Sequence, residues 1–163
     1  MNFPLSPTAL AIVVLATLAI PSCSRNDELA PPEIRLGRDE CIECGMIISE
    51  DRCSCSMVVV DEGHIQPQLF DDIGDMVDYE RSHPAMEIKR RYVHDYDTRA
   101  WIPAATASYA LCESIHTPMG SGLIAFTTPA AAEKFARDNG GKTIAYSELP
   151  DFRKQWHDHR HSR

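Results

Sequence analysis

Two stretches of this chain match when one is written above the other: residues 70–80 read FDDIGDMVDYE, and residues 126–136 read FTTPAAAEKFA. Each opens with an aromatic residue and a polar pair whose second member, Asp72 or Thr128, suits the N-cap of a helix. Pro129 follows Thr128 at the first helical position, where proline is well tolerated. Each stretch therefore predicts a helix, at an offset of 56 residues (126 − 70 = 56).

The segments around these helices keep the same register. Residues 57–60 and 88–94 are strand-like and lie on either side of the first helix, and Ile88 falls on Ile144 at the offset of 56. Strand-like segments around the second helix lie at 107–112, 122–127 and 143–146. We interpret this order as a duplicated ββαβ unit, which predicts an α+β fold.

Length and charge limit the possible functions. The chain has 163 residues, enough for one domain with a core, and a formal net charge of −8. Its basic residues form no patch apart from the short run Lys89-Arg90-Arg91. Nucleic-acid binding is therefore not expected.

The N-terminus resembles a lipoprotein signal. Residues 9–20 are apolar apart from Thr17, a run that is too short for a comfortable membrane span but typical of a secretory signal. Ile20-Pro21-Ser22-Cys23 resembles a bacterial lipobox, so Cys23 is predicted to be lipidated after cleavage at residue 22. An ordinary signal peptide and a buried helix ending at Pro21 are the alternatives.

The C-terminal tail begins with a helical pattern. Ser147 suits a cap, and Leu149, Phe152 and Trp156 have helical spacing. Residues 157–161 read HDHRH, and we expect this end to be disordered.

Four cysteines crowd residues 40–55, ECIECGMIISEDRCSC. Cys41, Cys44, Cys53 and Cys55 are compatible with a four-thiolate zinc site, a thioredoxin-like redox pair or disulfides. If Cys23 is lipidated, five cysteines remain, so at least one thiol stays free or binds a metal.

Cys44-Gly45-Met46 adds a fourth possibility. A thiolate and a thioether stand two residues apart, and the glycine between them lets the backbone bend so that both sulfurs converge. Such soft ligands select copper(I), whereas zinc has little use for methionine. A methionine is also a common core residue, so this motif alone leaves the choice open.

Other polar residues are weaker candidates. His94 lies beside Asp95, and His116 stands three residues before Met119, so each is a possible ligand. Asp71 and Asp72 resemble a pair of carboxylates for general acid–base catalysis, but their position at the start of a helix favours a capping role.

Several motifs together resemble the NosL family, lipoproteins of the periplasm or outer membrane that supply copper to nitrous oxide reductase in denitrification. The resemblance covers roughly residues 40–149. It rests on Cys44-Gly45-Met46, Phe70-Asp71-Asp72 with Met76, residues 93–96 (VHDY), Trp101-Ile102-Pro103-Ala104 with Ala107 and Tyr109, Pro118-Met119-Gly120 and Phe126.

The resemblance implies a fold and a site. The fold would be NosL/MerB-like, built from a pair of ββαβ units as in the organomercurial lyase MerB. Cys44 and Met46 would bind copper(I), and Met119 would be the third ligand. Cys41 is a possible further ligand, although a disulfide with Cys44 would block copper.

The resemblance also divides the chain and implies a partner. We expect a signal peptide at 1–22, a lipidated cysteine with its tether at 23–34, a copper-binding domain at 35–150 and a helical, histidine-containing tail at 151–163. The protein would sit in the cell envelope on a lipid anchor, at the outer membrane, and deliver copper to apo nitrous oxide reductase.

The expected function is therefore that of a copper(I) metallochaperone, not an enzyme. Two alternatives remain. One is a zinc-bound or disulfide-stapled periplasmic interaction domain. The other is a MerB-like carbon–mercury lyase, for which Cys44, Cys112 and Asp71 are the candidate residues.

Overall fold

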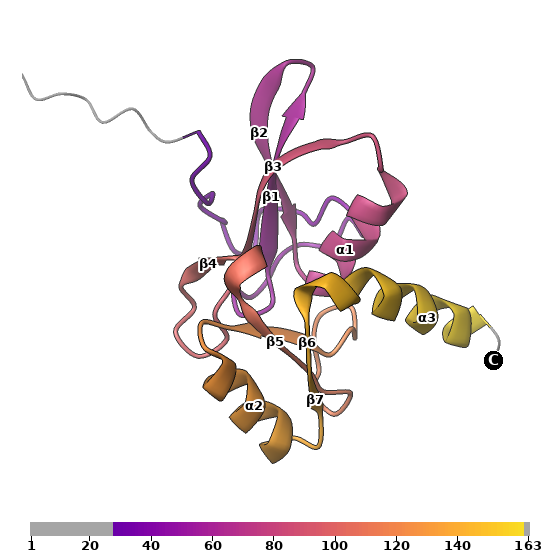
Figure 1. The fold of residues 1–163 in the computed structure, drawn as a ribbon. Helices are drawn as coiled ribbons and strands as arrows, with labels where there is room; N and C mark the ends of the chain where they lie inside the picture. The colour runs from indigo at the N-terminus through magenta and orange to yellow at the C-terminus, as the bar shows by residue number, and fades with distance from the viewer. Residues whose placement is uncertain (1–27, 162–163) are drawn as a thin grey trace, which may run out of the picture.

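The computed structural model describes residues 28–161 (Figure 1), so the predicted signal peptide and Cys23 lie outside the described part of the chain. The first of its two sheets has the strand order β2-β1-β3-β4, with every neighbouring pair antiparallel. Its strands and its helix are β1 (Cys55–Asp61), β2 (His64–Phe70), α1 (Ile73–Ser82), β3 (Glu87–His94) and β4 (Trp101–Pro103).

The second sheet is smaller and has the order β6-β5-β7, again antiparallel. Helix α2 covers it at the end of the molecule away from β1 and β2 (Figure 1). Its elements and the short helices beside them are η1 (Ala104–Thr106), β5 (Ser108–Leu111), β6 (Leu123–Phe126), α2 (Pro129–Asp138), β7 (Lys142–Ile144) and η2 (Tyr146–Glu148).

Both halves follow the order strand, strand, helix, strand, and in both the first strand is central. The predicted caps are confirmed: the Asp72 side chain accepts from Gly74 N at 2.7 Å, and the Thr128 side chain accepts from Ala131 N at 3.3 Å. The α+β class is thereby confirmed, and the origin of the two units by duplication stays an interpretation.

The main core is shared between the two halves. Cys55, Met57 and Val59 are alternate residues of β1, so they point to the same face of the first sheet. They belong to one buried cluster with Tyr109 and Leu123 of the second sheet. A smaller cluster, formed by Ala110, Cys112, Ile124, Phe126, Ala132 and Ala136, lies between that sheet and α2.

Asp95 joins the two halves just after β3. Its Oδ2 accepts from Thr127 N at 2.6 Å and from Thr127 Oγ1 at 2.7 Å, and its Oδ1 accepts from Thr98 N at 2.9 Å. Burial alone would raise the pKa of Asp95, but the hydrogen bonds from Thr127 and Thr98 outweigh it and lower the pKa to about 2.

The C-terminal helix α3 (Leu149–His161) extends farther than the sequence predicts. The expected disorder of residues 157–161 is wrong, because the helix continues to His161 and its Arg153 and His157 bond to Asp78 of α1. Ser147 is not its cap and lies within η2. None of the helices in residues 28–161 has the length and apolarity needed to cross a membrane.

Candidate metal centre

The cysteine loop, residues 37–48, closes on itself through backbone hydrogen bonds. Cys41 N donates to Met46 O at 2.8 Å, and Gly45 N donates to Cys41 O at 2.8 Å. Gly45 has φ +72, a left-handed conformation that side chains rarely adopt. The glycine between Cys44 and Met46 is therefore what allows the loop to turn back after Cys44.

Two anchors fix this loop to the body of the protein. Ile42 N donates to Leu69 O at 2.9 Å near the end of β2, and the Ile48 side chain is fully buried in the main core. Because the chain runs from β2 directly into α1, these anchors place the cysteines over the first turn of that helix.

Four ligand-type side chains meet there. Cys41 Sγ lies 3.6 Å from Asp75 Oδ2, and Cys44 Sγ lies 3.7 Å from Asp71 Oδ1. One ligand atom from each of these residues lies within 4.8 Å of all the others. Asp71 thus does not cap α1 as the sequence suggested; Asp72 alone does so, and Asp71 faces the cysteines.

The cluster is electrostatically unfavourable for several negative charges. Burial raises the pKa of the Cys41 and Cys44 thiols, and the Asp71 carboxylate adds to the rise at Cys44. Burial, followed by the charge of Asp72, raises the pKa of Asp75 to about 6. A bound cation would compensate these groups, so thiol protons would be released as the metal enters.

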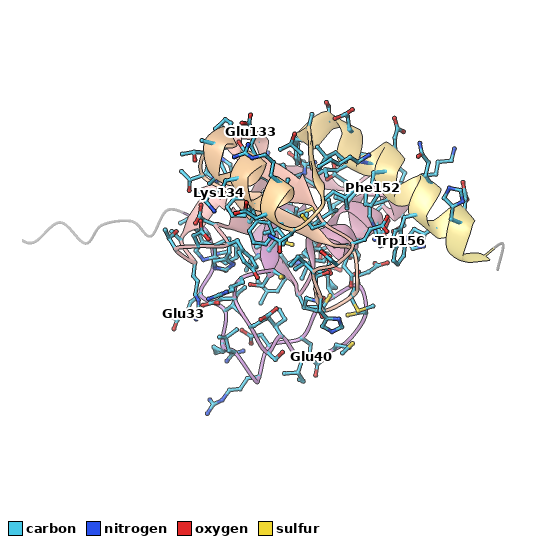
Figure 2. All side chains as sticks on the ribbon, turned by 90° about the horizontal axis from the view of Figure 1, so that it is seen from below. Glu33, Glu40, Glu133, Lys134, Phe152 and Trp156 are labelled. Atoms are coloured by element: carbon cyan, nitrogen blue, oxygen red, sulfur yellow. The ribbon has the colours of Figure 1, made fainter. Side chains whose placement is uncertain are left out.

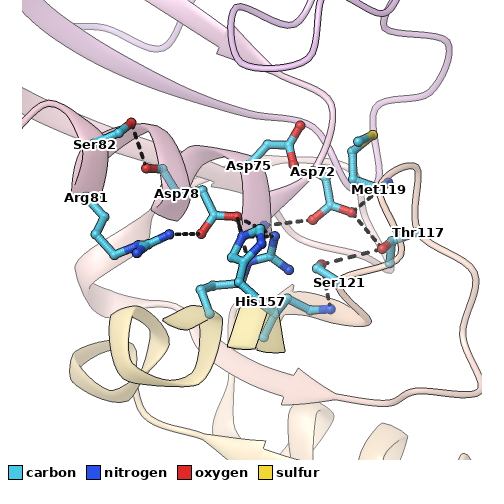
Figure 3. Close-up of polar contacts among 12 residues, drawn as sticks. Asp72, Asp75, Asp78, Arg81, Ser82, Thr117, Met119, Ser121 and His157 are labelled. Carbon is cyan, nitrogen blue, oxygen red and sulfur yellow. Dashed lines mark hydrogen bonds and ion pairs between the residues drawn. The ribbon is translucent and has the colours of Figure 1, made fainter. Parts of the chain in front are cut away.

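Cys44 also opens onto a cavity of about 310 Å³. Met119, the predicted third ligand, lines this cavity, and its backbone N donates to Asp72 Oδ2 at 3.0 Å. The same oxygen accepts from Thr117 Oγ1 at 2.7 Å (Figure 3). Asp72 therefore fixes both the start of α1 and the loop that carries Met119.

Met46, the other predicted thioether ligand, lies on the solvent side of the loop. Its side chain is 52% exposed. The cysteine loop thus offers one partly buried thiol at Cys44 and an exposed thioether two residues later.

The two candidate histidines lie outside the four-residue cluster. His94 is buried, with Nδ1 3.0 Å from Ser54 Oγ and its ring centroid 3.6 Å from that of Trp101. His116 is exposed on the loop between β5 and β6. Neither belongs to the group of metal-ligating side chains found in residues 28–161.

The remaining described cysteines are not part of the four-residue cluster. Cys53 is buried, Cys55 Sγ donates to Asp72 O at 3.4 Å, and Cys112 belongs to the core cluster beneath α2. The five described cysteines are all free thiols. Neither the four-thiolate set for zinc nor the lyase set with Cys112 is brought together.

Sequence reasoning missed the partnership of Asp75 with the cysteines. Asp71 stands just before the N-cap Asp72, and Asp75 lies in the first turn of α1. Their nearness in the sequence is the local signal, but their approach to Cys41 and Cys44 depends on contacts across 34 and 27 residues.

Comparison with known proteins bears on this arrangement. A family model described as NosL matches residues 34–152. Among solved structures, the chain is similar to the crystal structure of the copper chaperone NosL from Shewanella denitrificans: 23% identity, a TM-score of 0.65, and coverage of 74% of this chain and 95% of that one. No curated protein matches this chain significantly. Since the family model spans nearly all of the folded part, the chain belongs to the NosL family.

Proposed function

We propose that this protein binds copper(I) at Cys44 and passes it to an acceptor protein, as a metallochaperone and not as an enzyme. The observation that carries the proposal is the position of the Cys44 sulfur, which is partly buried beside Cys41 and opens onto the cavity lined by Met119. Thiolates and thioethers are the ligands that copper(I) prefers. The membership of the NosL family and the similarity to the structure of a copper chaperone support the same proposal.

The proposed ligands are Cys44, Met46 and Met119, with Cys41 as a second thiolate. Met46 starts from an exposed position, so it can close over a metal on Cys44 or leave it at low cost. Such a site suits transfer, because an acceptor ligand can add to the copper before Met46 and Met119 dissociate.

The surface around the cysteines is suited to transient contact with a partner protein. The exposed large apolar side chains in the described part of the chain are Leu36, Ile42, Met46, Ile47 and Ile65, and all but Ile65 lie on or beside the cysteine loop. Exposed apolar groups that gather in one place commonly mark a contact surface. The acceptor would therefore dock where the metal is held.

We further propose apo nitrous oxide reductase as the acceptor and the cell envelope, at the outer membrane, as the location. The support is the sequence resemblance and the lipobox-like Ile20-Pro21-Ser22-Cys23. A lipid on Cys23 would confine the carrier to a surface and raise its effective concentration near a partner on that surface.

A copper(I) titration of the reduced protein against a competing chelator tests the site. Cys44→Ser should weaken binding at least about 100-fold because the thiolate is its strongest soft ligand. Met46→Ala should weaken it on the order of 10-fold. Cys112→Ser is the matched control, since that thiol lies in the other core cluster. Wild-type affinity in Cys44→Ser would disprove the site.

One observation favours a second candidate, a zinc-binding domain. Asp71 and Asp75 add two carboxylates to the two cysteines, and zinc accepts both sulfur and oxygen ligands. Metal analysis of the protein purified under reduction separates the candidates. In the double variant Asp71→Asn/Asp75→Asn, a zinc site would lose affinity, whereas a copper(I) site on sulfur would keep it.

A further inference from the structure

Helix α3 contributes an imidazole to the cavity onto which Cys44 opens. His157 lines this space together with Cys44 and Met119. Figure 3 shows His157 beside Asp78 of α1. Asp72 and Asp75, at the start of the same helix, are drawn next to them. A nitrogen ligand thus borders the same cavity of about 310 Å³ as a thiol and a thioether, although the three residues come from distant parts of the chain.

A buried ion pair fixes the position of this histidine. Arg153 is 2% exposed, and its Nε donates to Asp78 Oδ2 at 3.0 Å while its Nη2 bonds to the same oxygen. Its guanidinium carbon lies 4.1 Å from the centre of the Trp156 ring. Figure 2 shows Trp156 and Phe152 along α3. A buried pair adds little net stability but imposes one geometry, so the pair sets the register of α3 on α1.

The contact between His157 and Asp78 has the form that metal-binding histidines use. His157 Nε2 lies 2.7 Å from Asp78 Oδ2. Because an ionised carboxylate only accepts, the proton of this bond is on Nε2, and the tautomer that fits it has its lone pair on Nδ1. Histidines that bind metals typically donate their other N–H to a carboxylate in this way, which fixes the tautomer and orients the ring.

Asp78 does not depend on His157 to balance its charge. Arg153 holds Oδ2, and Arg81 Nη2 lies 3.5 Å from Oδ1. A shift of the imidazole toward a metal would therefore leave the Asp78 carboxylate paired with two guanidinium groups. The bond to His157 is better explained as orientation of the ring than as neutralisation of the acid.

We propose that His157 is a nitrogen ligand of the copper(I) held by Cys44 and Met119. This inference rests on the proposed function and extends it to α3. The family model ends at residue 152, so Arg153, Trp156 and His157 all lie beyond the part of the chain that it matches. The proposed nitrogen ligand accordingly lies beyond the matched part, whereas its carboxylate partner Asp78 lies within it, on α1.

Copper(I) X-ray absorption of the reduced full chain, with chelator competition, tests the assignment. The wild type should show a nitrogen neighbour beside sulfur. His157→Ala and His157→Gln should both lose that nitrogen and bind copper(I) on the order of 10-fold more weakly. The glutamine can keep a hydrogen bond to Asp78 without supplying an imidazole, so it separates metal binding from the docking of α3.

His159→Ala is the matched control, because His159 is exposed on the same helix and does not line the cavity. It should keep both the nitrogen signal and the affinity. A His157→Gln variant with wild-type affinity and nitrogen count would overturn the inference while the sulfur site stands. If the wild type itself binds no copper(I), the proposed function fails, which is a different result.

Discussion

Helices α1 and α2 begin at equivalent caps, Asp72 and Thr128, yet they bury different side chains. The buried part of α1 includes Asp75 and Asp78, whereas the buried residues of α2 are Ala132 and Ala136. At the offset of 56 residues, Asp75 falls on Ala131 and Asp78 on Lys134. The same framework thus carries buried acids in one unit and a close-packed apolar face in the other.

The surroundings explain this difference. The cysteine loop and α3 cover α1, whereas α2 lies at the outer end of the molecule, where Glu133 and Lys134 appear on the opposite side from Glu40 of the loop (Figure 2). Buried carboxylates are tolerated where partners are supplied, as Arg153 is for Asp78. The site therefore depends on the cysteine loop and α3, which pack on α1, and not on the ββαβ unit itself.

The sharpest test of this contrast is Asp78→Ala, for which we expect the largest effect. Removing the carboxylate leaves the buried Arg153 guanidinium without its partner, so the free energy of unfolding should fall by about 4 kcal/mol. Urea unfolding followed by circular dichroism measures this loss of unfolding free energy. A loss comparable to that of a surface substitution would mean that α3 is not held by this pair.

An intermediate effect is expected for Asp95→Asn, at the junction of the two halves. The amide keeps one acceptor but loses the charge-assisted bonds to Thr127 and Thr98, at a cost of about 2 kcal/mol at pH 7.

The effect of Asp95→Asn should also depend on pH. The folded pKa of about 2 lies below the ordinary value of about 3.9, so the stabilisation is complete above about pH 5 and is lost as the pH falls toward 2. Unfolding of both proteins at pH 7 and pH 2.5 should show the difference shrinking in acid. A constant difference would contradict the assignment.

The smallest effect is expected for Lys134→Ala, the counterpart of Asp78 on α2. Its ammonium pairs with Asp138 at 2.5 Å, but both side chains are largely exposed, so water and salt screen the pair. The urea midpoint should not change measurably. A loss as large as that of Asp78→Ala would remove the contrast between the two helices.

The elements that the sequence predicts well depend on local signals. Asp72 and Thr128-Pro129 mark two helix starts within a few residues, and the continuous burial of β1 from Cys55 to Val59 follows from its apolar run. The family resemblance led to Cys44 and to Met119, which the structure places on one cavity.

The features that the sequence did not predict depend on tertiary contacts, which leave no signal in the local sequence. The polar sequence of 157–161 predicts disorder, but a pair between Asp78 and Arg153, 75 residues apart, holds the helix in place. Asp71 was assigned to capping because position alone cannot tell it from Asp72, and only the fold turns it toward Cys44. His94 beside Asp95 suggested a ligand, and the structure places its ring against Trp101, outside the four-residue cluster.

The shared main core has a consequence for how the protein unfolds. Residues of β1, such as Met57 and Val59, are buried in the same core cluster as Tyr109 and Leu123 of the second sheet. The main core is therefore completed only when both halves are present. A fragment that ended before β5 would leave much of its hydrophobic surface exposed to water. We therefore expect the two units to melt as one cooperative body, and the loop that carries Cys44 to gain its rigidity from residues that never approach a metal.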